Sequence, residues 1–424
     1  MTRPSILAVA VAVLTGVPGR AVDLPIQKYV ERLGSKSYAD RERATKALRR
    51  YGPVALPEVR KAVKSADEEV RFRAEGLARE LEVRAALEPK KVTLAGEGRP
   101  LSAVLADFQA QTGYRVRALG TATQQPVAID LNRVPFWNAL EQLGEKTGHA
   151  VTLDTYGSEL RFMQARVRPP YVQVAGPFRV EATRLHEDRD AVFRDPKPDG
   201  APGATTHTLT LTLAVHAEPR LTLISVGSPQ VDTATDEAAR AYTVVKQPAP
   251  GREYYSGYES ENMPLNRQTQ VRLQRAVDKA TTIAQLAGTI PVKVVIEKKR
   301  VVVSEKPAGA SGTRIRTGTG ELEITQATEE NGGAMFTLEV KVPVDANGMP
   351  NMQWTNRIKL EDANGNAFPS YSSGSRSTGR EYWMRKGYQL NAGGKFGAPA
   401  KIVFEDWVTI DHAIPFTFKG IALP

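Results

Sequence analysis

The pattern of apolar and polar residues changes period along the chain. From Ile26 to Leu87 the apolar positions follow a helical spacing, with breaks at Gly34 and at Gly52-Pro53. After this stretch helical runs alternate with short strand-like runs, and beyond Pro169-Pro170 apolar residues occupy every second position. These changes predict a multidomain α+β chain. The expected parts are a short α-helical block (22–88), a small repeated βαβ-like domain (90–165) and two antiparallel β-sandwich-like domains (170–307 and 312–424).

Two short sequences repeat within the helical block. RATKAL, from Arg43 to Leu48, and RAEGLA, from Arg73 to Ala78, each place a small alanine and an apolar residue on one helix face. The run DEEVRFRAEGLAREL, which begins at Asp67 as the expected N-cap, resembles a HEAT-type repeat. Two units are fewer than usually form a free solenoid, so the resemblance implies a block that packs on a neighbour or contacts a partner.

A longer unit repeats at an interval of 35 residues. FQAQTGYRV, from Phe108 to Val116, and LGEKTGHAV, from Leu143 to Val151, both end a helix, turn at a glycine and begin a strand. Each copy reads as strand, proline at the first helical position, helix, glycine at the helix end and strand. The matched pairs are Val92/Val127, Pro100/Pro135, Leu105/Leu140, Thr112/Thr147, Gly113/Gly148 and Val116/Val151.

This repeat predicts two βαβ-like halves that cover a small sheet, which a strand from Glu159 to Met163 completes. The stretches PLSAVLADFQAQTGYRV and VAIDLNRVPFWNALEQLGEKTGHAV resemble the short N-terminal domain of secretins and TonB-dependent receptors. That resemblance implies a periplasmic docking or signalling domain without catalytic residues. No barrel-forming body follows it here, so it implies an interaction domain and not transport. The helix faces expected to be buried are Leu101, Val104, Leu105 and Phe108, and Phe136, Leu140 and Leu143.

The remaining chain reads as strands with short polar connections. HTLTLTLAVHAEP, from His207 to Pro219, alternates leucine and threonine as a half-buried strand does. TIPVKVVI and AIPFTFKGIALP share a start at Ile-Pro, and the whole pattern favours antiparallel sandwiches. Helical repeats, a docking module and a sandwich ending in IPFTFKGIALP also resemble uncharacterised exported multidomain proteins of planctomycete-type bacteria. That resemblance implies an architecture and no activity.

The first 21 residues have the layout of a secretory signal. Arg3 precedes an apolar run from Ile6 to Val17, and Gly19-Arg20-Ala21 offers a small-residue cleavage site, so cleavage after Ala21 is expected. An uncleaved anchor is the alternative, disfavoured because Pro18 breaks a longer helix. The run is too short to span a bilayer, and no later stretch approaches that length. We therefore expect an exported chain, periplasmic or associated with the cell envelope, without a transmembrane span.

Composition narrows the choice of function. The chain has 424 residues, of which 41% are hydrophobic and 25% charged, enough apolar surface for several cores. It has no cysteine, which excludes disulfides and thiolate metal sites. The net charge is +10; without Arg3 and Arg20 there are 55 bases and 47 acids, or +8. This charge would favour binding to acidic surfaces. Nucleic-acid binding is not predicted, because the bases are spread along the chain and no recognised nucleic-acid-binding module accompanies them.

The sequence offers little catalytic chemistry. His207 and His216 lie in one expected strand at an odd separation, so they point to opposite faces; His149, His186 and His412 have no ligand-spaced partner. No metalloprotease, phosphate-loop, nucleophile-elbow or dinucleotide motif occurs. We expect no metal, no cofactor and no catalytic residue.

The tetrapeptide DANG occurs twice, at Asp345–Gly348 and at Asp362–Gly365. Its oxygen atoms could bind calcium, but the bidentate glutamate of a calcium loop is missing, and Asn-Gly is common in tight turns. Two turns are therefore predicted.

An aromatic theme also occurs twice, as GREYYSGY from Gly251 to Tyr258 and as GREYW from Gly379 to Trp383. Rings beside arginine in polar loops could stack on sugars or hold a peptide. The alternative, which we favour, is that the rings pack onto their own sandwich. The candidate ligand-binding residues are Arg252, Tyr254, Tyr255, Tyr258, Arg380, Tyr382 and Trp383.

The leading hypothesis is a non-enzymatic, exported interaction or scaffold protein of the cell envelope with an envelope protein as partner. The first alternative is binding of carbohydrate or another envelope polymer through the aromatic loops. An envelope hydrolase is the weakest alternative, because it needs two carboxylates at a defined separation. The acids near the aromatic residues are Glu253, Glu259, Glu261 and Glu381.

Overall fold

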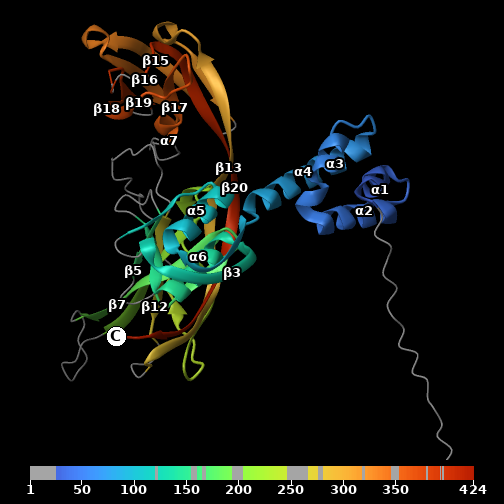
Figure 1. The fold of residues 1–424 in the computed structure, drawn as a ribbon, viewed down its shortest axis with the longest axis vertical. Helices are drawn as coiled ribbons and strands as arrows, with labels where there is room; N and C mark the ends of the chain where they lie inside the picture. Colours follow the sequence, from blue (N-terminus) through green and yellow to red (C-terminus); the bar gives the residue numbers. More distant parts are fainter. Residues whose placement is uncertain are drawn as a thin grey trace, which may run out of the picture. The chain divides into compact units, whose positions relative to one another are not determined.

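A computed structural model of the chain shows a mixed α+β protein in which strands predominate and several sheets are antiparallel (Figure 1). It divides into two units, residues 1–86 and 87–424, which we describe separately. None of the described helices is long and apolar enough to cross a membrane. The expected signal (1–21) lies outside the described residues, which are 25–119, 123–153, 160–164, 169–192, 204–245, 266–275, 280–317, 320–344, 353–378, 381–391, 393 and 396–424.

The first unit is a helical block. Ala44 and Ala74, the alanines of the repeated RATKAL and RAEGLA sequences, are both buried in its core. Asp67 accepts a hydrogen bond from the backbone N–H of Val70 at 3.1 Å, which confirms its expected role as an N-cap. The helices are α1 (Ile26–Glu31), α2 (Tyr38–Tyr51), α3 (Leu56–Ala62) and α4 (Glu68–Leu87), with short 3₁₀ turns at Arg32–Gly34 and Gly52–Ala55.

The second unit begins with the repeated domain, in which each half contributes one helix. The elements are β1 (Lys91–Pro100), α5 (Leu101–Thr112), β2 (Val116–Ala118), β3 (Pro126–Pro135), α6 (Phe136–Thr147), β4 (His149–Leu153) and β5 (Leu160–Gln164). Gly113 and Gly148 adopt the left-handed conformation expected at the helix ends, with φ of 79° and 72°. The seven apolar positions expected on the helix faces are all buried.

The arrangement of sheets in this domain differs from the prediction. Instead of one small sheet there are two: β1 pairs with β3, and the order of the other sheet is β2-β5-β4, so that β5 completes it as expected. Each helix contacts strands of both sheets, so the helices lie between them. Pro100 and Pro135 occupy the N-cap position, one residue before the helix.

Two β-sandwiches follow. The first contains β6 (Val172–Ala175), β7 (Phe178–Val192), β8 (Ala204–Ala217), β9 (Thr222–Val226), β10 (Gln230–Asp236), β11 (Thr243–Val244), β12 (Asn266–Gln274) and β13 (Thr282–Ser304). The second contains β14 (Arg314–Thr317), β15 (Gly320–Glu330), β16 (Met335–Val342), α7 (Gln353–Asn356), β17 (Ile358–Asp362), β18 (Ser370–Thr378), β19 (Glu381–Gln389) and β20 (Pro399–Ala422). Short 3₁₀ turns lie at Pro307–Gly309 and Asn331–Gly333.

The sandwiches repeat one topology. One sheet of the first has the order β11-β12-β8-β7-β6, and the corresponding sheet of the second has the order β18-β19-β16-β15-β14. The strands β10 and β17 end in equivalent loops: the Oδ1 atoms of Asp236 and Asp362 each accept the backbone N–H groups two and four residues later, at 2.8–2.9 Å. The second sandwich is therefore built as a copy of the first.

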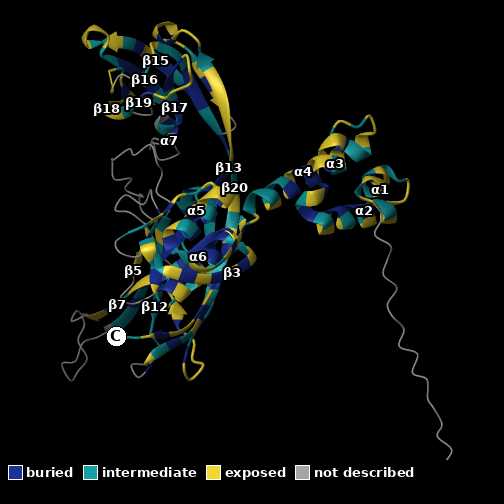
Figure 2. Ribbon diagram, in the orientation of Figure 1, coloured by how far each residue is buried: buried dark blue, intermediate teal, exposed yellow. Residues whose placement is uncertain are grey.

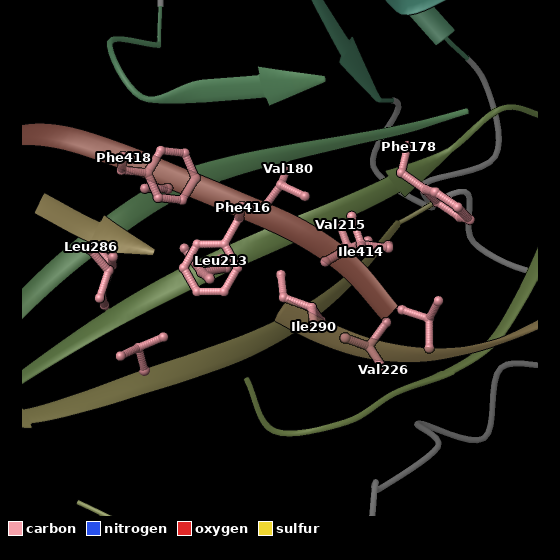
Figure 3. Packing of buried hydrophobic residues seen from close by; sticks show 14 of the residues in the cluster. Phe178, Val180, Leu213, Val215, Val226, Leu286, Ile290, Ile414, Phe416 and Phe418 are labelled. Carbon is pink, nitrogen blue, oxygen red and sulfur yellow. The ribbon is translucent and has the colours of Figure 1, made fainter. Parts of the chain in front are cut away.

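The last strand of each sandwich continues into the other sandwich. β13 has 23 residues and β20 has 24, and the two pair antiparallel over most of their length (Figure 1). Figure 3 shows Ile414, Phe416 and Phe418 of β20 among side chains of the first sandwich such as Leu213 and Ile290. The sequence prediction had assigned the strand AIPFTFKGIALP to the second sandwich. The structure places it in the core of the first, because β20 is long enough to serve both.

Candidate functional site

Of the seven candidate ligand-binding residues, only Tyr382 and Trp383 lie within the described residues. Tyr382 and Trp383 are neighbours on β19, so their side chains point to opposite faces of the sheet. Tyr382 packs against the core of the second sandwich, as the favoured interpretation expects. Trp383 lies on the outer face with 9% of its surface exposed. The other five candidates, Arg252, Tyr254, Tyr255, Tyr258 and Arg380, lie outside the described residues.

Cations cover the ring of Trp383. Arg376 and Lys341 are its direct neighbours on the adjacent strands β18 and β16. The guanidinium carbon of Arg376 is 4.0 Å from the ring centroid, and Nζ of Lys341 is 5.7 Å from it. Glu339 accepts two hydrogen bonds from Arg376, at 3.0 and 2.9 Å, which lowers the pKa of Glu339 and holds the guanidinium in place. This geometry makes Trp383 a structural anchor and leaves its face unavailable for stacking on a sugar.

We predict that Trp383→Ala destabilises the second sandwich without changing retention on insoluble envelope glycan. The loss of a large, nearly buried ring costs about 3 kcal/mol in unfolding free energy. Denaturant unfolding followed by fluorescence measures the first effect, and cosedimentation with the glycan measures the second. Arg385→Ala, an exposed change on the same strand, is the control. Loss of glycan retention in a folded Trp383→Ala protein would contradict the assignment.

A hollow beside Trp383 lacks the features of a hydrolase site. Its volume is about 520 Å³, and its lining includes Glu321, Glu323 and Glu381. Glu381 forms an ion pair with Lys341, and the hydrogen bond from Arg316 lowers the pKa of Glu321. A general acid needs a raised pKa, and these carboxylates are paired with bases. The other acids named for this hypothesis, Glu253, Glu259 and Glu261, lie outside the described residues.

The second DANG sequence forms a turn. The backbone N–H of Gly365 donates to the carbonyl of Asp362 at 3.1 Å, which confirms the prediction for this copy. Both carboxylate oxygens of Asp362 accept two hydrogen bonds each, and the one from the Asn366 side chain contributes most to lowering its pKa to about 2. A carboxylate so fully bonded has no free oxygen for a cation. The first copy, Asp345–Gly348, lies outside the described residues.

Buried charges join the repeated domain to the first sandwich. Arg179 of β7 is buried and donates to Glu141 of α6 at 2.7 Å and to Glu181 at 2.6 Å. Beside them, the indole N–H of Trp137 donates to the carbonyl of Pro177 at 3.1 Å. No local sequence pattern reveals this cluster, because Arg179 and Glu141 are 38 residues apart along the chain. It fixes the repeated domain to the sandwich.

A second buried carboxylate lies at the same junction. Glu218 has no exposed surface and accepts the backbone N–H of Lys90 at 3.1 Å and Nε of Arg220 at 2.9 Å. Burial raises its pKa despite these partners. Because its oxygens bond Arg220 and the backbone of Lys90, just before β1, we assign Glu218 a structural role.

His216 belongs to the first of these clusters. Its Nε2 atom is 3.9 Å from Glu181, and its ring packs edge-on against Trp137 with centroids 6.1 Å apart. Burial, with the charge of Arg179 as a smaller contribution, lowers its pKa to about 3, so the imidazole is neutral at physiological pH. β8 runs without a register shift from His207 to His216, so these two side chains point to opposite faces as predicted.

We predict that His216 makes the protein less stable in mild acid. The unfolded state takes up a proton near pH 6.5 while the folded state resists it down to about pH 3, so stability is lost as pH falls through this window. At pH 5 the loss from this group is about 2 kcal/mol relative to neutral pH. Denaturant unfolding at pH 7 and pH 5 should show a smaller difference in His216→Gln than in the wild type. Equal differences would rule the effect out.

The helical block contains a groove. One wall of the groove is α4, and the other is α3 together with the turn that follows α3. Its volume is about 810 Å³, and Val63 and Ala78 contribute an apolar surface to its lining. The charged lining residues are four bases and two acids. Among the described residues, no group of three or more histidine, aspartate or glutamate side chains is placed to hold a metal ion.

The bases of the groove differ in their partners. Arg60 and Lys61 are paired with glutamates at 2.9 and 2.6 Å. Lys64 and Arg79 form no ion pair with any described residue; Arg79 donates only to the backbone carbonyl of Glu75, at 3.3 Å. The groove leaves two cations available to a ligand.

Comparisons with known proteins give no family. No family model matches the chain, and no curated protein matches it. One solved structure, "The crystal structure of the conserved domain protein from Bacillus anthracis", has 10% sequence identity and a TM-score of 0.11, covering 62% of this chain and 94% of its own. A score this low does not establish a shared fold, so the function must be argued from the residues of this chain.

Proposed function

We propose that the chain is a non-enzymatic, exported protein of the cell envelope that binds a protein partner through its helical block. The groove between α3 and α4 is the observation on which this proposal rests. It combines an apolar surface with two cations, Lys64 and Arg79, that have no carboxylate partner among the described residues. Residues 25–86 contain 15 bases and 10 acids, or a net charge of +5. An acidic segment with apolar side chains is the ligand that matches these properties.

Exposed apolar side chains support a protein partner. Tyr38, Val54 and Phe72 of the helical block expose 66%, 72% and 74% of their surface. Large exposed apolar residues on charged helices are more typical of a protein interface than of a small-molecule pocket. The resemblance to HEAT-type repeats, whose stacked helices present binding surfaces, agrees with this proposal.

The repeated domain has a supporting role in the proposal. Its resemblance to the short N-terminal domain of secretins and TonB-dependent receptors suggests a docking module. The Arg179–Glu141 ion pair and the hydrogen bond that Glu218 accepts from the backbone N–H of Lys90 would hold this module in a fixed position on the first sandwich. The expected secretory signal supports a location in the periplasm or at the cell envelope.

A charge-reversal experiment tests the groove. Mature protein carrying Lys64→Glu and Arg79→Glu is compared with Lys28→Glu, Lys46→Glu, which makes the same charge change at exposed positions outside the groove. Both are cross-linked to envelope extract, and the captured proteins are quantified by mass spectrometry. We expect one envelope protein to fall at least about tenfold in the groove variant alone, which corresponds to 1.4 kcal/mol. Equal capture by both variants would refute the groove as the docking surface.

A further inference from the structure

The helical block is built from two copies of one helix pair. The shift of 30 residues that relates RATKAL to RAEGLA also aligns α1 with α3 and α2 with α4. At the start of α2, Arg41 donates to the carbonyl of Ser35 at 2.7 Å. At the start of α4, Arg71 donates in the same way to the carbonyl of Ser65 at 3.0 Å. The two pairs therefore begin their long helices with the same turn.

The second helix pair covers one face of the first. Arg41 of α2 forms an ion pair with Glu69 of α4 at 2.9 Å. Arg49 of α2 forms another with Glu80 of α4 at 2.8 Å. Because the residue numbers of both partners rise together, α4 runs parallel to α2. Leu48, beside Arg49, has no exposed surface and belongs to the core that the two pairs share.

The equivalent face of the second pair is open. Arg71 and Arg79 form no ion pair with a described residue, and their printed bonds go to backbone carbonyls. Phe72 exposes 74% of its surface, and exposed and half-buried residues run along α4 (Figure 2). Arg79 lines the groove described above, whereas Arg71 and Phe72 are not among its lining residues. The positions of Arg41, Leu48 and Arg49 on α2 correspond to those of Arg71, Ala78 and Arg79 on α4.

The sequence explains why no third helix pair follows. α2 ends at Gly52, which has a φ of 66°, and Pro53 cannot continue the helix. The equivalent residues of α4 are Glu82 and Val83, neither of which ends a helix. α4 therefore continues to Leu87, and the chain then enters β1 instead of folding back into another pair.

The ion pairs of the first face define the charges of a helix that fits the second. Glu69 and Glu80, which meet the two arginines of α2, are separated by 11 residues (69 to 80). A helix bound in the same way presents one carboxylate to Arg71 and a second, 11 residues later, to Arg79. Both arginines then gain the partners that their equivalents on α2 already have.

Phe72 defines an apolar position on the same helix. On α2 its place is taken by Glu42, which accepts a hydrogen bond from Arg73 of α4 at 2.8 Å. A phenylalanine cannot accept this bond, so the matching helix has an apolar residue where α4 has Arg73, four residues after its first carboxylate. Further apolar positions follow from the residues of α4 that are buried in the shared core, which are Ala74, Leu77 and Leu81.

A second copy of this chain does not meet these requirements. A head-to-tail stack would place α2 of another copy on α4, with Ala39 and Arg50 at the positions that Glu69 and Glu80 occupy. Arg50 would then meet Arg79, and like charges in contact oppose such an assembly. The open face therefore selects a different protein.

We propose that the partner of the helical block is an acidic amphipathic helix that docks parallel to α4, with carboxylates at positions i and i+11 on Arg71 and Arg79 and an apolar residue at i+4 on Phe72. Apolar residues at i+5, i+8 and i+12 cover Ala78 of the groove. The inference rests on the proposed function, because it specifies the partner bound at the groove, and it extends the contact beyond the groove to Arg71 and Phe72.

A synthetic helix tests the docking geometry. The probe is a fluorescein-labelled peptide of 20 alanine and glutamine residues that carries glutamate at positions 4 and 15 and leucine at positions 8, 9, 12 and 16. Anisotropy titration with the mature protein should give a Kd below about 100 µM. Arg71→Glu and Arg79→Glu should each weaken binding at least about tenfold. Lys46→Glu, at an exposed base of α2, is the control and should change it less than about threefold.

Charge exchange between peptide and protein reports the orientation. Lysine in place of the first glutamate of the peptide should restore binding to Arg71→Glu, and lysine in place of the second should restore binding to Arg79→Glu. The opposite pattern would mean antiparallel docking and would overturn the proposal. Absence of rescue, or no binding to the wild type up to about 500 µM, would overturn it as well. Rescue also shows that the variants are folded.

A second arm separates this inference from the proposed function. The variant Arg71→Glu, Phe72→Ala is cross-linked to envelope extract beside Lys64→Glu, Arg79→Glu. Loss of the same envelope protein from both variants supports the docked helix. Loss from the groove variant alone leaves the groove as a binding surface and overturns the helix. Undiminished capture by both variants contradicts the proposed function and, with it, the inference.

Discussion

Deletion of Thr409–Pro424 is expected to unfold the first sandwich and to leave the second folded. The deleted segment carries Ile414, Phe416, Phe418 and Ile421, all buried in the first core. Truncation of one such side chain to alanine costs about 2–5 kcal/mol, and a domain is stable by only about 5–15 kcal/mol, so the first sandwich cannot survive the loss of all four. Hydrogen exchange followed by mass spectrometry should show β7 and β8 unprotected and β16 and β19 still protected.

Point substitutions provide the control for this deletion. Phe416→Ala should lower the unfolding free energy of the first sandwich by about 3–5 kcal/mol, whereas Lys419→Ala, at an exposed position on the same strand, should change it by less than about 0.5 kcal/mol. If the deletion instead removed protection from the second sandwich alone, the assignment of this strand to the first core would be wrong.

Replacement of Arg179 by alanine is expected to cost about 3 kcal/mol, because it removes a buried guanidinium and leaves the partly exposed Glu141 and Glu181 without their shared partner. The repeated domain should then separate from the sandwich before global unfolding. Limited proteolysis should release the repeated domain from the sandwich sooner than in the wild type, and circular dichroism should show a lower midpoint of thermal unfolding.

Two variants accompany this test. Arg184→Ala removes an exposed arginine from the same strand and should leave both measurements unchanged. The triple variant Arg179→Met, Glu141→Leu, Glu181→Leu removes every charge of the cluster and should recover most of the lost stability. A single Arg179→Ala variant as stable as the wild type would show that the ion pairs do not hold the junction.

Local signals in the sequence predicted local structure well. Gly113 and Gly148 end their helices as expected, because the backbone there adopts a left-handed conformation that glycine accepts without strain. The apolar residues expected on the helix faces of the repeat are all buried, also as expected. The turn at Asp362–Gly365 was predictable because its aspartate, asparagine and glycine residues favour turns. These features depend on residues within a few positions of each other.

Features that depend on distant residues were missed. The alternating pattern of β20 is the same whichever sheet the strand joins, so the sequence could not show that its second half belongs to the first sandwich. From the sequence alone, Arg179 would be interpreted as a solvent-exposed residue of an alternating strand. Only the fold places Glu141 within hydrogen-bonding distance of it. The groove at Lys64 and Arg79 likewise needs two helices in contact before its unpaired cations are evident.

The shared strands set the order in which the chain can fold during synthesis. The core of the first sandwich contains Phe178 and also Phe418, so its last strand leaves the ribosome only after the whole of the second sandwich. Contacts so far apart in sequence form slowly, and until they form the first core remains incomplete. In a nascent chain the first sandwich therefore stays incomplete, and open to proteases and chaperones, until the final strand is made.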